Sequence, residues 1–197
     1  MTETSRMATR PFDRNLHHRR SVRLPNYDYS QAGAYFVTIV CKDHALLLED
    51  PALHAIVEDA WLWLARQYAY VHIDEYAIMP NHLHGILVIR DARKGGSRTA
   101  LTDAAKRKPL GRLIGAFKTV STKRINTMRG TRQAQIWQRN YYERVIRDED
   151  ELNRVRKYIK ENPLRWEDDP ENPERQRASH AQSERTDVLF GQENWTQ

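Results

Sequence analysis

Two histidines separated by one residue are the part of this sequence best suited to binding a metal ion. His82 and His84 lie in the stretch MPNHLHGILVIR. Alternate side chains of a β-strand point to the same face, so both imidazoles would project from one face while Leu83 points to the other. Two neutral imidazoles that converge suit a divalent cation with open positions for substrate oxygens. The alternative is two partly exposed strand histidines, because a His-x-His pair alone is a weak signal.

A tyrosine and an amide near residue 160 could complete such a site. Tyr158 and Asn162 are four residues apart and would share one face of a helix. A tyrosine can attack phosphorus, but its ordinary pKa of about 10 means that it needs an electrophile or a base. A cation held by His82, His84 and the carbonyl oxygen of Asn162 could draw charge from a phosphate oxygen. An isolated tyrosine here would instead be a half-buried helix residue with its hydroxyl in water.

The first half of the chain contains the elements that must position the histidines. Residues 34–42 are rich in aromatic and β-branched side chains, which predicts a buried strand. Pro51 opens a segment whose apolar residues recur at intervals of three and four, as on one face of a helix. Residues 71–79 and 82–90 are separated by a Pro-Asn turn and predict a β-hairpin.

The second half contains the elements that must position the tyrosine. Residues 91–109 contain two glycines and few large apolar side chains, which indicates a flexible connection. Helical periodicity returns over 110–125, and a short strand is expected around 136–146. Asp148 and Glu151 form the pattern of a capping box that begins a last helix.

The order β-α-β-β-α-β followed by a third helix predicts an α+β fold. We expect a ferredoxin-like split βαβ sandwich, in which an antiparallel sheet carries helices and a C-terminal helix carries Tyr158.

The distribution of charge favours a polyanionic partner. Between Ala104 and Arg147 there are twelve lysines or arginines and one acid, within a chain of net charge +6. Such a stretch is the electrostatic footprint of nucleic acid binding, although each cation taken singly could be a solvated surface charge. The candidate phosphate ligands are Arg112, Lys118, Lys123, Arg124, Arg129, Arg139 and Arg144.

Composition divides the chain and excludes several classes of protein. Residues 1–25 read as a basic arm, 26–166 as one folded domain that contains the candidate site, and 167–197, with eight acids against three basic residues, as an acidic tail. No apolar run approaches the roughly 18 residues of a membrane span. No signal peptide is recognisable, so we expect a cytoplasmic protein.

Three further features leave alternatives open. The single cysteine excludes an internal disulfide; Cys41 could join the histidines in a zinc site, but a small buried hydrophobe is the favoured interpretation. Asp74 and Glu75 could place a carboxylate next to the metal-binding side chains and orient them by hydrogen bonds. Tyr141 and Tyr142 are rival nucleophiles, although their place on a predicted strand favours packing or contact with DNA.

Several stretches together resemble the REP-associated tyrosine transposases, which are relatives of the single-tyrosine HUH transposases. The HUH motif has two histidines around a bulky hydrophobic residue, here His82, Leu83 and His84. The resemblance runs from about Ser21 to Trp166. It rests on MPNHLHGIL, on WQRNYYERVIRDEDELNRVRKYIKENPLRW, and on the similar stretches SVRLPNYDYSQAGAYFVTIVCK and GRLIGAFKTVSTKRIN.

The resemblance implies a specific reaction. In this family the HUH histidines hold Mg²⁺ or Mn²⁺, and a tyrosine on the final helix attacks DNA, giving a 5′-phosphotyrosine link and a free 3′-hydroxyl. By motif match the nucleophile is Tyr158. The third ligand is Asn162, where better-known relatives carry the longer Gln. The expected substrate is single-stranded DNA folded as a short imperfect hairpin, bound by a monomer or a homodimer.

Two other functions would use the same fold. One is a protein that binds hairpin DNA without cutting it, which the presence of all four candidate site residues disfavours. The other is an HUH replication initiator or relaxase, which the small size and the lack of a helicase domain disfavour.

Overall fold

A computed structural model describes residues 24, 26–91 and 107–175. Three expected features therefore lie largely outside the described residues. They are the N-terminal arm (1–25), most of the connection over 91–109, and the acidic tail beyond residue 175. Among the helices that the structure describes, none is both long and apolar enough to cross a membrane.

The centre of the fold is a four-stranded antiparallel sheet. Its strands are β1 (Gly33–Val40), β2 (Val71–Met79), β3 (His82–Ile89) and β4 (Tyr142–Ile146), in the order β2-β3-β1-β4. The helices between β1 and β2 and between β3 and β4 make this the strand order of a split βαβ sandwich. The predicted fold class is confirmed.

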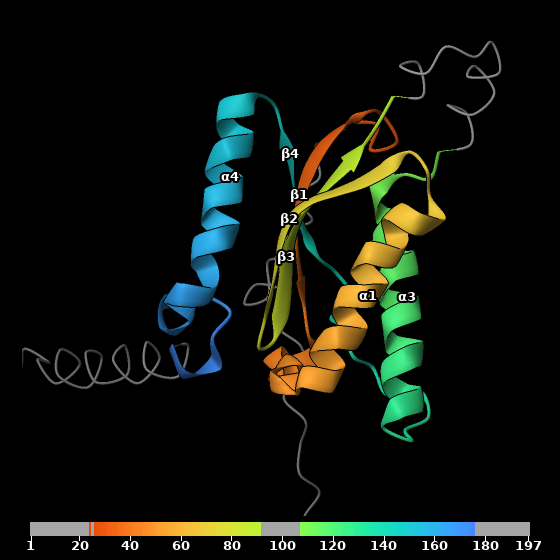
Figure 1. Ribbon diagram of the computed structural model, residues 1–197, viewed down its shortest axis with the longest axis vertical. Helices are drawn as coiled ribbons and strands as arrows, with labels where there is room; N and C mark the ends of the chain where they lie inside the picture. Colours follow the sequence, from red (N-terminus) through yellow and green to blue (C-terminus); the bar gives the residue numbers. More distant parts are fainter. Residues whose placement is uncertain (1–23, 25, 92–106, 176–197) are drawn as a thin grey trace, which may run out of the picture.

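Helices cover both faces of the sheet (Figure 1). Helices α1 (Pro51–Gln67) and α3 (Leu110–Met128) lie side by side on one face, and α4 (Glu149–Glu161) lies on the other. Short 3₁₀ helices connect these layers. They are η1 (Lys42–His44) and η2 (Leu47–Glu49) before α1, and η4 (Asn162–Asp168) after α4.

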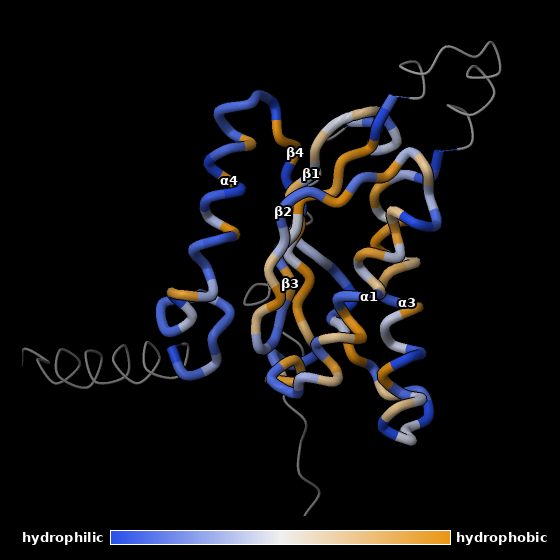
Figure 2. The backbone as a smooth tube through the Cα atoms, viewed as in Figure 1, coloured by the Kyte–Doolittle hydropathy of each residue, from blue (hydrophilic) through white to orange (hydrophobic). Residues whose placement is uncertain are grey.

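The alternation of side chains along the strands builds two separate cores. Val37 of β1 and Leu87 of β3 belong to a large cluster with residues of α1 and α3. Phe36 and Ile86, each one residue away, belong to a small cluster with Ile159 of α4. Figure 2 shows the difference, since α1 and α3 carry hydrophobic residues along their inner sides while α4 is hydrophilic over most of its length.

A glycine lets α1 approach the strand that carries the histidines. A Cβ atom added at Gly85 of β3 would lie 2.6 Å from Cζ2 of Trp61, a side chain of α1 with no exposed surface. This separation is shorter than any van der Waals contact, so a larger residue would push the helix and the strand apart. Close packing therefore fixes β3 against the main core.

Helix α4 begins at the predicted cap, with one difference. The side chain of Asp148 accepts a hydrogen bond from the backbone N–H of Glu151 at 2.7 Å. The carboxylate of Glu151 accepts from the N–H of Arg147 at 3.0 Å, one residue before the position that a capping box would use. The first half of the predicted motif is thus confirmed, and the reciprocal bond is displaced by one residue.

Two carboxylates of β2 attach α4 to the sheet. Arg156 of α4 donates from Nε and Nη2 to the two carboxylate oxygens of Asp74, at 2.8 and 2.7 Å. Lys160, one turn further on, forms an ion pair with Glu75 at 3.1 Å. Asp74 and Glu75 therefore hold the tyrosine-bearing helix in place, whereas the sequence suggested them as supports for metal ligands.

The last predicted strand is shorter than expected. Within 136–146 only Tyr142–Ile146 pairs continuously with β1, while Trp137 makes an isolated bridge to Cys41. The first strand, predicted over 34–42, also ends early, at Val40. Asp43 takes a left-handed conformation (φ 55°), and the chain turns into η1.

Candidate active site

His82 and His84 point together toward the α4 side of the sheet. Antiparallel pairing with β1 places His82 opposite Val40 and His84 opposite Thr38. Both imidazoles are buried, and their Nε2 atoms lie 3.0 Å apart. Leu83 points to the opposite face and joins the main core, as the strand period predicts.

A polar side chain behind each histidine fixes its ring. Asn81 accepts a hydrogen bond from Nδ1 of His82 at 2.8 Å, because its Oδ1 atom can only accept. The hydroxyl of Thr38 lies 2.9 Å from Nδ1 of His84. Because the Nδ1 atom of each ring contacts one of these polar side chains, both Nε2 atoms face the space between the rings. A metal-binding histidine needs this orientation.

Helix α4 brings Tyr158 to these histidines. The phenolic oxygen lies 3.3 Å from Nε2 of His84, and the two ring centroids are 5.3 Å apart. The ring of Phe36 meets Tyr158 edge-on at 6.0 Å and stacks on His84 at 5.5 Å. The structure thus brings together a phenol and two imidazoles that lie 74 residues or more apart in the chain.

A carboxylate that the sequence placed in the acidic tail also belongs to this cluster. Asp169, directly after η4, is buried, and its Oδ2 atom lies 3.8 Å from Nε2 of His82 and 4.0 Å from Nε2 of His84. Its other oxygen accepts from the N–H of Glu171 at 2.7 Å. Nothing in the local sequence distinguishes Asp169 from its acidic neighbours in EDDPE, so only the folded chain reveals it.

Asn162, the predicted third ligand, is buried at the end of α4, one turn beyond Tyr158. Its Nδ2 atom has no hydrogen-bond partner among the described residues. Oxygen and nitrogen of an amide can exchange places by rotation of the side chain, which would turn an oxygen lone pair into this unpaired position. Asn162 also acts on Tyr158, since its side chain lowers the pKa of the phenol. Its assignment as a metal ligand stays a prediction.

Burial favours the neutral form of His82 and the protonated form of Tyr158. Desolvation, reinforced by the neighbouring His84, holds the pKa of His82 well below its ordinary value. Desolvation also raises the pKa of Tyr158, and the negative charge of Asp169 raises it further. Burial acts to raise the pKa of Asp169, but the His84 imidazole and the N–H of Glu171 outweigh it and lower that pKa. A neutral imidazole at His82 beside an ionised carboxylate at Asp169 suits the binding of a cation.

The donor set fits a divalent metal ion. One ligand atom from each of His82, His84 and Asp169 lies within 4.8 Å of the others. Neighbouring ligands of an octahedral ion with bonds of about 2.1 Å are about 3.0 Å apart, which matches the two histidine nitrogens. Cys41 does not join them, because it packs in the main core on the α1 side, where burial raises the pKa of its thiol to about 12.

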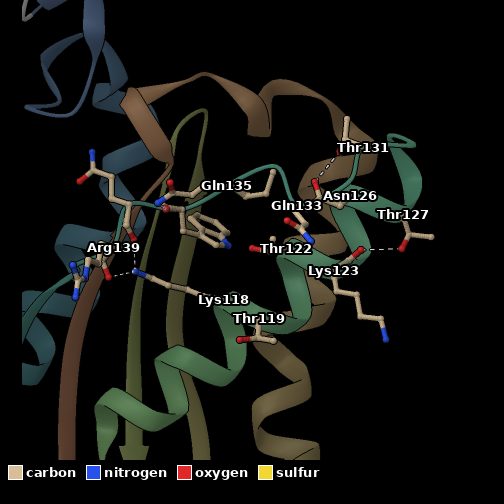
Figure 3. Close-up of a pocket in the computed structure, with 13 residues that line it drawn as sticks. Lys118, Thr119, Thr122, Lys123, Asn126, Thr127, Thr131, Gln133, Gln135 and Arg139 are labelled. Atoms are coloured by element: carbon tan, nitrogen blue, oxygen red, sulfur yellow. Dashed lines mark hydrogen bonds between the residues drawn. The ribbon is translucent and has the colours of Figure 1, made fainter. Parts of the chain in front are cut away.

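The basic residues of α3 lie across the sheet from this cluster. Lys118 is half-buried and donates from Nζ to the carbonyl oxygens of Gln138 at 2.8 Å and Arg139 at 3.4 Å (Figure 3). It also donates to the carbonyl oxygen of Asn140 at 3.0 Å. Burial lowers its pKa to about 8. Arg124 forms an ion pair with Asp59 of α1. The charged groups of these two candidate phosphate ligands are thus already bonded to other residues of the protein.

The other basic candidates are exposed, at two different places. Arg112, Lys123 and Arg129 belong to α3 or its end, and Arg139 lies in the following loop. Lys123 and Arg139 border an open groove of about 610 Å³ whose lining residues are mostly of polar types (Figure 3). Arg144 lies on β4, where it pairs with Glu151 of α4 at 2.6 Å, on the side of the sheet that holds the histidines.

Comparisons with known proteins return solved structures and a sequence relative. No protein-family model matches the chain. It is similar to a REP-associated tyrosine transposase solved with a REP hairpin, at 18% identity and a TM-score of 0.47, over 73% of each chain. It is also similar to a "putative transposase" of Deinococcus radiodurans R1, at 17% identity and a TM-score of 0.39, over 72% of this chain and 96% of that one.

The sequence relative is an "Uncharacterized protein" of Haemophilus influenzae strain Rd. The two are 35% identical over 176 residues, which cover 82% of this chain and 97% of the relative. The chain therefore belongs to the same protein family as this Haemophilus influenzae protein.

Proposed function

We propose that this protein is a metal-dependent transposase that cleaves and rejoins single-stranded DNA at hairpin sites through Tyr158. One observation carries the proposal. The phenolic oxygen of Tyr158 lies 3.3 Å from Nε2 of His84, which is itself 3.0 Å from Nε2 of His82. A nucleophile that lies beside two imidazole nitrogens able to bind a metal ion is suited to phosphodiester chemistry.

The residues that would hold Mg²⁺ or Mn²⁺ are His82, His84 and Asp169, with Asn162 as a further oxygen donor. When bound, the cation would withdraw charge from a non-bridging oxygen of the attacked phosphate. Asn81 and Thr38 would keep the imidazoles oriented toward it. Arg156 and Lys160, through Asp74 and Glu75, would keep α4 against the sheet so that the phenol stays in reach.

The covalent step exchanges one phosphoester for another. The oxygen of Tyr158 forms a bond to phosphorus while the bond from phosphorus to the 3′-oxygen breaks. The phenol releases its proton to solvent, and the departing 3′-oxygen gains one, so that a 5′-phosphotyrosine and a free 3′-hydroxyl result. Attack of a 3′-hydroxyl on the phosphotyrosine reverses these changes and rejoins DNA, without an added energy source.

The test is the formation of a covalent adduct. End-labelled hairpin oligonucleotides with randomised single-stranded flanks are incubated with the full chain and Mn²⁺, Mg²⁺ or a chelator, then separated under denaturing conditions. We expect a metal-dependent protein-DNA adduct that Tyr158→Phe abolishes, while hairpin affinity is retained. Tyr141→Phe and Tyr142→Phe, which remove the rival hydroxyls, are matched controls and should still form the adduct.

Two results would contradict the proposal. A normal adduct from Tyr158→Phe would show that another residue is the nucleophile. Tight hairpin binding with no adduct under any metal condition would favour a protein that binds hairpin DNA without cutting it.

A further inference from the structure

A small pocket opens beside Tyr158, on the side away from the strand β2. It lies between β4, an edge strand of the sheet, and α4, and its volume is about 220 Å³. Tyr158 forms one wall, so any group in this pocket would lie next to the proposed nucleophile. The lining residues are Phe36, Tyr142, Arg144, Glu151, Arg154, Val155 and Tyr158.

Aromatic rings form much of the pocket surface. Phe36 lies at the centre, with its ring centroid 6.1 Å from that of Tyr142 and 6.0 Å from that of Tyr158. Phe36 is buried, whereas Tyr142 is 40% exposed and Tyr158 is 46% exposed. Two large aromatic side chains this exposed in one place are unexplained by packing and offer flat surfaces to a ligand.

The charges around these rings favour a polyanion. Arg144 and Arg154 border the pocket, and both are exposed. The single acid in the lining, Glu151, is buried and already accepts from Arg144 and from the N–H of Arg147. Arg154 has no ion-pair partner among the described residues, which leaves a guanidinium available to a phosphate group.

We propose that this pocket binds one unpaired nucleobase next to the phosphodiester that Tyr158 attacks, with the base stacked on Tyr142 and the adjacent phosphate bound by Arg154. The inference rests on the proposed function and adds a subsite to it. Exposed aromatic rings beside arginines are the features by which proteins hold single-stranded nucleic acid. An unpaired base has a free face that can stack on Tyr142, whereas the bases of a duplex already stack on one another, so the features of this pocket suit single-stranded DNA.

The experiment measures binding, so that it does not depend on cleavage. Fluorescence anisotropy of the full chain is recorded with an eight-residue oligothymidine and with an eight-residue abasic deoxyribose phosphate strand, which has the same backbone charge and no bases. The wild-type protein should prefer oligothymidine. Tyr142→Ala should weaken oligothymidine binding about 5- to 150-fold and leave the abasic strand unaffected, because stacking is worth about 1–3 kcal/mol per base.

Four more variants separate the effect of stacking from that of charge, and a folding control completes the set. Tyr142→Phe and Tyr142→Trp should retain oligothymidine affinity, since both keep an aromatic ring. Arg154→Gln should weaken both probes by a similar factor, whereas Lys157→Gln, which removes one charge from the same helix outside the pocket, should have a smaller effect. Circular dichroism should give the same spectrum for Tyr142→Ala as for the wild type.

The inference is overturned if the wild type binds both probes equally, or if Tyr142→Ala weakens both by the same factor. Its failure is distinct from failure of the proposed function. If the adduct forms but Tyr142 has no effect on binding, the base-binding pocket is wrong and the proposed cleavage activity still holds. If binding of bases depends on Tyr142 but no adduct forms, the pocket still holds and the proposed cleavage activity is wrong.

Discussion

Asn81 links His82 to the segment that carries Asp169. Its Oδ1 accepts from Nδ1 of His82 at 2.8 Å, and its Nδ2 donates to the carbonyl of Glu171 at 2.6 Å. Asn81 has no exposed surface, and both bonds are buried. One side chain in the hairpin turn therefore orients a histidine and also holds the chain after η4 against the sheet.

Loss of Asn81 should weaken metal binding. Asn81→Ala removes both bonds, so we expect Mn²⁺ affinity to fall about 10- to 100-fold, as for other partners of metal-binding histidines. Titration calorimetry with Mn²⁺ measures this change. Asn140→Ala, at an exposed loop position, is the control and should bind Mn²⁺ like the wild type. An unchanged affinity in Asn81→Ala would show that His82 does not need its partner.

Asp169 should act as a metal ligand. Asp169→Asn keeps the shape of the side chain and removes its charge, so Mn²⁺ affinity should fall at least about tenfold, since a carboxylate oxygen is a preferred ligand of hard cations. The adjacent Asp168→Asn removes the same charge at an exposed position and should change the affinity by less than about threefold. Equal effects of the two variants would mean that only the general charge of the segment matters.

The ion pair between Asp74 and Arg156 should make stability depend on pH. The hydrogen bonds from Arg156 outweigh the effect of burial and lower the pKa of Asp74 below its ordinary 3.8. Because the folded-state pKa is the lower one, the pair contributes stability above pH 3.8, and this contribution is lost as the pH falls through the folded-state value. Asp74→Asn should therefore cost about 1–3 kcal/mol of unfolding free energy at pH 7 and less at acidic pH.

Urea denaturation at pH 7 and at about pH 3 measures this difference. The control is Asp43→Asn, since Asp43 is exposed and forms an ion pair with its neighbour Lys42 at 2.6 Å. Asp43→Asn should lower the free energy of unfolding by less than about 1 kcal/mol, as for other surface ion pairs. If Asp74→Asn lowered the free energy of unfolding equally at both pH values, the stabilising role of the ion pair between Asp74 and Arg156 would be contradicted.

The contact between Gly85 and Trp61 should not tolerate a methyl group. Gly85→Ala places a Cβ 2.6 Å from the Trp61 ring, and we expect about 1–3 kcal/mol of destabilisation from overpacking. Gly115→Ala, in α3, has open space at its Cβ and should instead stabilise the protein by about 0.5–1 kcal/mol. Urea denaturation of both variants compares the two. Equal effects would mean that the α1 contact with β3 adjusts freely.

Local periodicity in the sequence was sufficient to predict the elements and most of the proposed site. The two-residue period of a strand puts His82 and His84 on one face, and the four-residue spacing puts Tyr158 and Asn162 on one face of a helix. Hydrophobic patterns and the Asp148 cap gave the element order, and that order allows few arrangements besides a split βαβ sandwich.

Only the tertiary structure decided what faces the histidines. Asp169 is one of several similar acids in its segment, and long-range bonds through Asn81 bring it to the site. Asp74 likewise has no local signal for its partner, which lies 82 residues away. The basic helix α3 lies on the face opposite α4, although its charge pattern alone could fit either side. Local sequence sets the direction of a side chain within its own element, but contacts between distant elements depend on how the layers pack.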